Sequence, residues 1–232
     1  MKQSRSSKVR VLLVDDHPIV RRGLSDVVSR EPDLEVCGEA GSEGEAIRIA
    51  RKSAPSLAIV DLALEKGHGL EVVRQLRTLS RDVKILVLSV YDEAIYAERA
   101  IRAGALGYVQ KRDATDHLIA AIRQVLRGNV YLSVGASERM LHKMVHTGDR
   151  KNAANAAPLS NREVEVLGLI AEGYGSQDIA DRLGISVKTV NTHRENIKKK
   201  LSLRRGSELT RYAASWHEEM VRDSANPSSK RA

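Results

Sequence analysis

Residues 9–18 read VRVLLVDDHP, a run of β-branched and leucine residues that ends in two aspartates, a histidine and a proline. A short apolar run of this kind predicts a buried strand, and Pro18 favours a helix directly after it. The same alternation of apolar run and helix-patterned segment occurs five times between residues 8 and 128. The expected strands cover residues 9–15, 34–40, 57–61, 84–89 and 107–111.

The segments between these runs carry apolar residues at helical spacing. The expected helices cover residues 18–30, 43–52, 69–79, 92–103 and 115–126. Strands that are apolar on both faces and are joined by crossover helices indicate a parallel sheet covered on both sides. We therefore predict a doubly wound α/β domain over residues 8–128, with a five-stranded parallel sheet.

The periodicity and the composition of the sequence change after this domain. Residues 129–158 show weak periodicity, and the piece 147–158, TGDRKNAANAAP, is small, polar and closed by a proline. This composition is typical of a linker, which a helix at 136–145 is expected to interrupt. Residues 129–158 are therefore interpreted as a linker between two domains.

Residues 159–217 predict a small all-α domain. Glycine or serine separates four helical patterns, at residues 161–172, 176–183, 187–201 and 206–216. The polar residues 218–232 are expected to form a disordered tail.

Positive charge is concentrated in this second domain. The 232 residues have a net charge of +8. Residues 8–128 hold 19 Lys and Arg against 18 Asp and Glu, whereas residues 186–211 hold 8 against 2. A basic segment of this kind favours a polyanionic partner such as double-stranded DNA.

Cysteine content and hydropathy predict the compartment. Cys37 is the one cysteine, so no internal disulfide can form, and no Cys or His group has the spacing of zinc ligands. No apolar run approaches the length of a signal-peptide core or a membrane span. We expect a cytoplasmic protein that does not enter a membrane.

Polar and charged residues stand where the predicted strands end. Asp15 and Asp16 end the first strand, Asp61 the third, Ser89 the fourth and Lys111 the fifth. Parallel strands end at one edge of a sheet, so these side chains should converge there. Three carboxylates repel one another, which favours a hard cation such as Mg²⁺. One carboxylate could then attack a phosphoryl donor, and the central position of Asp61 makes it the expected nucleophile.

Each of these residues also has an ordinary structural interpretation. Asp15 and Asp16 could cap the helix that begins near Pro18, Ser89 could be a turn residue, and Lys111 could be a solvated charge. Because all of these residues are expected at one sheet edge, a site for Mg²⁺ and phosphoryl transfer is favoured over these separate structural roles. His17 is interpreted as a structural neighbour of the acidic pair rather than as an acid or base.

Four segments resemble the receiver domain of response regulators over residues 8–128: VLLVDDHPIVRRGL, IVDLALEKGHGLE, LSVYD and GALGYVQKRD. The resemblance implies a flavodoxin-like sheet of order 2-1-3-4-5 and Asp61 as the acceptor of phosphate from a histidine kinase or a small phosphodonor. It also implies a role for each of the neighbouring positions. Mg²⁺ would be held by Asp15, Asp16, Asp61 and the main-chain carbonyl of Ala63, Lys111 would bind the phosphoryl group, and Ser89 with Tyr108 would form the switch pair.

One position departs from the receiver pattern. Glu65 stands where the family usually has proline, in the loop after the acceptor. We expect this difference to alter the stiffness of the loop without removing the chemistry.

A helix-turn-helix is predicted in the second domain. Ile179, Ala180 and Leu183 recur at helical spacing, Gly184 breaks the pattern, and Ser186 can cap the next helix. Along that next helix, an apolar stripe of Val190, Ile197 and Leu201 is flanked by polar residues. Without further signals, a solvated amphipathic helix would explain the same pattern.

The string LSNREVEVLGLIAEGYGSQDIADRLGISVKTVNTHRENIKKKL resembles the LuxR-type DNA-binding domain. The resemblance implies a recognition helix at about 187–200, with Asn191, Thr192 and Glu195 at base-reading positions. Asn suits adenine and Glu suits cytosine. The expected phosphate contacts are Lys188, Thr189, Arg194, Lys198 and Lys199. The last helix of this family commonly forms the dimer contact, so a homodimer is expected in the active state.

Together the two domains resemble a NarL/FixJ family response regulator, a transcription regulator rather than an enzyme. A phosphatase that forms an aspartyl phosphate would need an acid–base Asp two residues after the nucleophile, where Ala63 stands. An NTP-driven enzyme is disfavoured because no G-x-x-x-x-G-K-[ST] run exists. A DNA-binding protein that does not depend on phosphorylation is the remaining alternative, and only Glu65 favours it.

Overall fold

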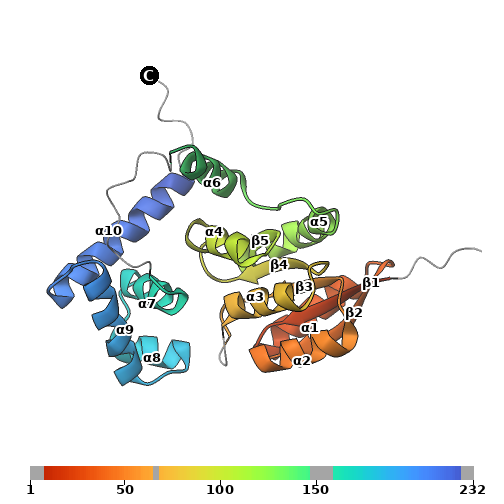
Figure 1. Ribbon diagram of the computed structural model, residues 1–232, viewed down its shortest axis with the longest axis horizontal. Helices are drawn as coiled ribbons and strands as arrows, with labels where there is room; N and C mark the ends of the chain where they lie inside the picture. Colours follow the sequence, from red (N-terminus) through yellow and green to blue (C-terminus); the bar gives the residue numbers. More distant parts are fainter. Residues whose placement is uncertain (1–7, 65–67, 147–158, 226–232) are drawn as a thin grey trace, which may run out of the picture. The chain divides into compact units, whose positions relative to one another are not determined.

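The computed structural model describes residues 8–64, 68–146 and 159–225 and divides into two compact units, one ending at Ser133 and the other beginning at Val134 (Figure 1). Glu65, the linker piece 147–158 and residues 226–232 lie outside the described part.

The first unit is a five-stranded parallel sheet of order β2-β1-β3-β4-β5, so the predicted doubly wound fold is confirmed. Its elements are β1 (Val9–Val14), α1 (Pro18–Ser29), β2 (Leu34–Ala40), α2 (Glu43–Ser53), β3 (Leu57–Val60), α3 (Gly69–Leu79), β4 (Lys84–Ser89), α4 (Glu93–Ala103), β5 (Gly107–Gln110), a 3-10 turn (Lys111–Asp113) and α5 (Ala114–Leu126). Strands β1, β3 and β5 each end one residue earlier than predicted.

Helices α1 and α5 cover one face of the sheet. Leu24 and Val28 of α1, with Leu118 and Ile122 of α5, join side chains of β1, β3 and β4 in one buried apolar cluster. Helix α3 contacts both α2 and α4. Strands β1 and β3 are the inner strands around which the chain reverses direction, so their carboxyl ends lie at the crevice where such sheets bind ligands.

The second unit is all helical, as predicted. It contains α6 (Val134–His146), α7 (Asn161–Ala171), α8 (Ser176–Leu183), α9 (Val187–Lys200) and α10 (Gly206–Ala225). Helix α6 corresponds to the helix expected at 136–145. Apolar side chains of α7, α8, α9 and α10 form one core that includes Leu167, Ile179, Val190, Ile197 and Leu209.

Helix α10 corrects the predicted tail. It continues to Ala225, whereas the sequence pattern placed its end at Trp216 and a disordered tail at 218–232. Residues 217–225, HEEMVRDSA, contain no glycine or proline, and Pro227 is the first residue that would stop a helix. Polar composition therefore did not end the helix. None of the helices in the described ranges is both long and apolar enough to cross a bilayer.

Candidate functional site

The carboxyl ends of β1 and β3 bring Asp15 and Asp61 together. The main-chain N–H of Asp15 donates to the carbonyl of Ala40 at 3.0 Å, and that of Asp61 donates to Val14 at 2.8 Å. These bonds extend the sheet ladder by one residue and place both carboxylates at its edge. Asp15 is 1% exposed and Asp61 is 2% exposed.

Lys111 bridges the two buried carboxylates. It follows β5 as the first residue of the 3-10 turn, and its Nζ lies 2.6 Å from Asp15 Oδ2 and 2.6 Å from Asp61 Oδ2. Charge-assisted contacts of this length are strong, and they compensate part of the cost of burying two like charges. Residues 15, 61 and 111, which are far apart in sequence, thus form one ion cluster.

Asp16 and His17 complete the cluster. One ligand atom from each of Asp15, Asp16, His17 and Asp61 lies within 4.8 Å of all the others. His17 Nδ1 is 2.6 Å from Asp16 Oδ1 and 3.4 Å from Asp15 Oδ1, and its main-chain N–H donates to Asp15 Oδ1 at 2.9 Å. His17 therefore contacts the acidic pair directly, as expected for a structural neighbour of these residues.

Arg21 is a further residue at this site that the sequence pattern did not indicate. This residue lies one turn into α1, and its guanidinium donates to the main-chain carbonyl of Asp15 at 2.5 Å. The contact holds the end of β1 against the helix that follows it. An arginine six residues after the acidic position could have been detected only from the geometry of the strand–helix turn.

Burial and the neighbouring charges act in opposite directions on the pKa values of Asp61 and Lys111. Burial raises the pKa of Asp61 above its usual value, and the nearby charge of Lys111 opposes this shift without cancelling it. Burial would lower the pKa of Lys111, but the charges of Asp61 and Asp15 raise it overall. The lysine therefore stays cationic, and a second cation would help to keep Asp61 ionised.

The donor set fits Mg²⁺. Three carboxylates supply hard oxygen ligands within reach of one point, which is the chemistry that this ion prefers. Ala63 is adjacent, since its main-chain N–H donates to Asp61 Oδ1 at 3.0 Å. This bond also orients the Asp61 carboxylate.

Ser89 and Tyr108 lie beside the cluster. Ser89 ends β4 and is fully buried, and its Oγ accepts from the main-chain N–H of Tyr91 at 3.3 Å. Tyr108 on β5 is 1% exposed, and its hydroxyl donates to the carbonyl of Tyr91 at 2.9 Å. Burial raises the pKa of Tyr108 well above its usual value, although a hydrogen bond with Ser89 works to lower it. Both predicted switch residues therefore contact the loop between β4 and α4.

Helix α9 presents the predicted DNA-contacting residues. The side chain of Ser186 caps it by accepting from the N–H of Thr189 at 3.0 Å, and Val190 and Ile197 are buried in the core. Lys188, Asn191, Thr192, Glu195 and Lys199 are exposed, whereas Thr189, Arg194 and Lys198 are half-buried.

Two contacts limit the freedom of these side chains. Asn191 Oδ1 accepts from Ser176 Oγ, at the start of α8, at 3.0 Å. Lys198 Nζ lies 2.8 Å from Glu195 Oε1, so a predicted phosphate contact is paired with a predicted base contact. Lys199 is the more exposed of the two adjacent lysines.

Polar groups on α7 contact both α8 and α9. Lys200 Nζ is 2.7 Å from Glu163, and Arg162 donates to Glu165 at 2.8 Å and to the carbonyl of Leu183 at 2.7 Å. Burial and the charge of Arg162 lower the pKa of His193, which favours a neutral imidazole at this packed position.

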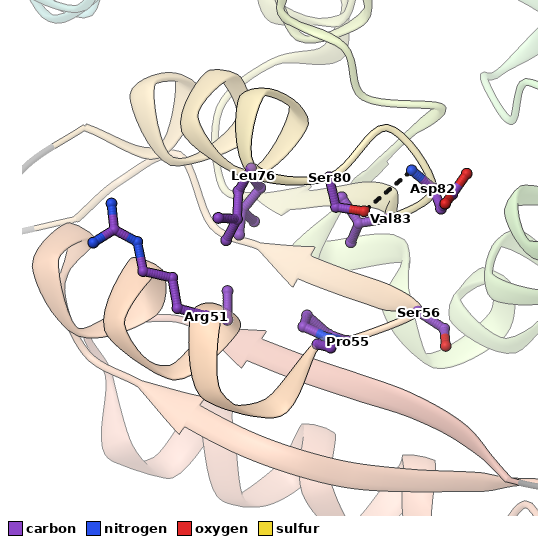
Figure 2. A pocket seen from close by; sticks show the side chains of 10 residues that line it. Arg51, Pro55, Ser56, Leu76, Ser80, Asp82 and Val83 are labelled. Atoms are coloured by element: carbon purple, nitrogen blue, oxygen red, sulfur yellow. Dashed lines mark hydrogen bonds between the residues drawn. The ribbon is translucent and has the colours of Figure 1, made fainter.

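A separate hollow lies between α2 and α3, at the other edge of the sheet (Figure 2). It encloses about 480 Å³, and its walls are mainly apolar, with Arg51 and Asp82 among the lining residues. The buried ionic groups lie at the carboxyl edge instead, so the candidate chemistry belongs there.

Comparisons with known proteins agree with this division. Residues 11–123 match the family described as the response regulator receiver domain, and residues 157–213 match the bacterial regulatory proteins of the luxR family. Oxygen regulatory protein NreC of Staphylococcus carnosus is 36% identical over 209 residues, which cover 88% of this chain and 96% of the relative.

Two solved structures are also similar. A two-component response regulator of the LuxR family from Aurantimonas sp. SI85-9A1 is 34% identical, with a TM-score of 0.55, over 60% of this chain and 99% of that one. RcsB from Salmonella enterica serovar Typhimurium, bound to promoter P1flhDC in the presence of the phosphomimetic BeF3-, is 26% identical, with a TM-score of 0.57, over 90% and 100%. The chain belongs to the NarL/FixJ family of two-component response regulators, which are transcription regulators that join a receiver domain to a LuxR-type DNA-binding domain.

Proposed function

We propose that Asp61 accepts a phosphoryl group from a histidine kinase or a small phosphodonor. The position of Lys111 supports this most directly, because its Nζ lies 2.6 Å from Oδ2 of both Asp15 and Asp61. A carboxylate oxygen of Asp61 would bond to phosphorus while the bond from phosphorus to the donor's histidine nitrogen or acyl oxygen breaks. The ammonium group of Lys111 would move from the carboxylate to a phosphoryl oxygen, where it offsets negative charge.

Asp15, Asp16, Asp61 and the main-chain carbonyl of Ala63 are proposed to hold Mg²⁺. The bound ion would offset the charge on the transferred oxygens. Arg21 orients the end of β1, and the N–H of Ala63 orients the Asp61 carboxylate, so the chain itself positions the nucleophile. His17 would have to exchange its contact with Asp16 for solvent when the ion binds.

Ser89 and Tyr108 are proposed to transmit the event. A phosphoryl oxygen on Asp61 would offer the Ser89 hydroxyl a charged acceptor, which is stronger than its present neutral contacts. The loop at Tyr91 hydrogen bonds to both switch residues, so it would move with them.

The output is proposed to be sequence-specific binding of double-stranded DNA by a homodimer in the cytoplasm. RcsB, a similar protein, is bound to promoter DNA and as dimers on DNA in its structures. The proposed base contacts are Asn191, Thr192 and Glu195, and the proposed phosphate contacts are Lys188, Thr189, Arg194, Lys198 and Lys199. Half-sites should be about 10 bp apart.

The proposed domain boundaries are 8–128 for the receiver, 129–158 for the linker, 159–217 for the DNA-binding domain and 218–232 for a C-terminal extension. Helix α10 occupies the first part of that extension.

Selection of binding sites from random duplex DNA tests the proposal. Full-length protein with Mg²⁺ would be compared before and after treatment with an acyl phosphate, with Asp61→Ala treated in parallel. We expect one dyad-symmetric motif, bound more tightly after treatment and unaffected by treatment in the variant. Equal enrichment in all samples would refute the switch, and no enrichment would refute DNA recognition.

A further inference from the structure

The residues that leave the receiver pair with the open edge of its sheet. Strand β5 is the last strand, so one of its sides has no strand partner within the five-stranded sheet. Tyr131, five residues after α5, forms a parallel bridge with Gly107. Its N–H donates to the carbonyl of Leu106 at 2.9 Å, and its carbonyl accepts from the N–H of Tyr108 at 2.9 Å. The path out of the receiver thus hydrogen bonds to the main chain of the proposed switch tyrosine.

Packing holds this segment close to β5. The half-buried ring of Tyr131 joins the core cluster under α5. A Cβ on Gly107 would lie 2.8 Å from Leu86, 3.0 Å from Val125 and 3.2 Å from the Cβ of Tyr131, so glycine at position 107 makes room for all three side chains. Unpaired strand edges are usually covered, and here the connection to α6 covers one.

A second contact reaches α4. Ser133 directly precedes α6, and its main-chain N–H donates to Glu93 Oε1 at 2.9 Å. Glu93 is the first residue of α4 and follows the loop whose Tyr91 bonds both Ser89 and Tyr108. Figure 1 shows β5 beside α4, the two elements that supply Tyr108 and Glu93 to these contacts.

We propose that residues 129–133 are a latch, which ties the C-terminal end of the receiver to its own switch face in the unphosphorylated protein and is released at Glu93 on phosphorylation. When Ser89 turns toward a phosphoryl oxygen, the N–H of Tyr91 loses its acceptor. The loop then shifts, and Glu93 moves away from Ser133. The release step rests on the proposed function, whereas the contact itself does not.

Amide hydrogen exchange in the full-length protein tests the latch. Exchange at Ser133 and Tyr131 would be followed by NMR, with Mg²⁺, before and after addition of BeF3-, while phosphoryl incorporation from an acyl phosphate is followed by mass spectrometry. Loss of one hydrogen bond should speed exchange at Ser133 by about tenfold. Wild-type protein with BeF3- should show this increase.

Substitutions at α4 separate the contact from the charge. Glu93→Ala removes the acceptor, so the untreated variant should exchange at Ser133 as fast as treated wild type. Glu93→Gln keeps an oxygen acceptor and should retain most of the protection. Glu98→Ala removes a carboxylate from the same helix, where Glu98 pairs with Arg102, and should leave Ser133 unchanged.

The outcomes are distinguishable. Unchanged Ser133 exchange in Glu93→Ala would overturn the latch, whatever happens at Asp61. Phosphoryl incorporation with unchanged exchange at Ser133 would overturn the release step and leave the proposed function intact. Absence of incorporation would overturn the proposed function together with the release step, and Glu93→Ala would still decide the contact.

Discussion

The pocket at the sheet edge and the surface of α9 hold their functional side chains in opposite ways. Asp15, Asp61 and Lys111 are buried, come from three strand ends, and make contacts of 2.6 Å to one another. On α9, Asn191 and Lys199 are exposed on one helix, and the contact to Asn191 comes from a serine side chain.

This difference explains how each region can be altered. A buried ion cluster is cooperative, because removing one member leaves the others without compensation. An exposed helix face is a set of mostly independent contacts, each of which affects DNA binding by its own amount, with the Lys198–Glu195 pair as the coupled exception. Substitutions in the pocket should therefore have large, coupled effects, and those on α9 should have small, separable ones.

The largest expected effect is that of Asp61→Ala, which should abolish acid-labile phosphate incorporation. The reason is that the chain would lose the nucleophile, and Asp15 and Asp16 lie on a different strand end. Intact mass after acyl phosphate treatment measures the effect. Asp26→Ala, which removes an exposed carboxylate from α1, should incorporate phosphate like wild type. Continued labelling of Asp61→Ala would show that another residue is the acceptor.

Lys111→Met should lower the free energy of unfolding by about 3 kcal/mol in the absence of divalent cations, because two buried carboxylates lose their shared partner. Urea unfolding measures this value, and Mg²⁺ should restore part of it by binding the folded state. Lys52→Met, on the exposed surface of α2, is the matched control. Equal loss in both variants would show that the bridge does not stabilise the fold.

The same pair of proteins gives a pH prediction. The carboxylates raise the pKa of Lys111 above 10.5 despite its burial, so the folded state holds this proton more tightly than the unfolded state. The stabilisation is fully present below pH 10.5 and is lost as pH rises through the folded-state pKa. The difference in the free energy of unfolding between wild type and Lys111→Met should therefore be constant from neutral pH to about pH 10.5. It should shrink at higher pH. A difference that grew with alkaline pH would contradict the sign.

Asn191→Ala should reduce discrimination at one base pair by about 1–3 kcal/mol while leaving the salt dependence of binding unchanged. The exposed amide stands at a proposed base-reading position and carries no charge. Competition between the selected site and single-base variants measures the loss. A uniform loss over all sequences would instead indicate that Asn191 contacts the backbone.

The smallest expected effect is at the two adjacent lysines. Lys199→Ala should weaken binding equally for all sequences and reduce the salt slope by about one unit. Lys198→Ala should do the same and, because Lys198 pairs with Glu195, should also change base preference near Glu195. Identical base preferences in the two variants would show that the ion pair does not orient Glu195 on DNA.

Most of the sheet and the acidic part of the pocket could be predicted from sequence. The alternation of apolar runs and helical patterns indicated every strand of the sheet, and the parallel direction placed Asp15, Asp61, Ser89 and Lys111 at one edge. Asp16 was expected at the same edge, and only the expected role of Tyr108 came from the family resemblance. The contact of Arg21 and the particular atoms through which His17 meets Asp16 could not be predicted, because they depend on side-chain directions in the turn that follows β1.

By itself, then, the sequence determined the order of elements, the two-part organisation and the family, since these follow from periodicity and local motifs. The tertiary structure alone decided three further features: the bridge from Lys111 to both aspartates, the pairing of Lys198 with Glu195, and the return of Tyr131 to β5. Each depends on rotamers or on register between segments that local pattern does not encode. Helix α10 shows the same limit, because polar composition alone did not decide where it ends.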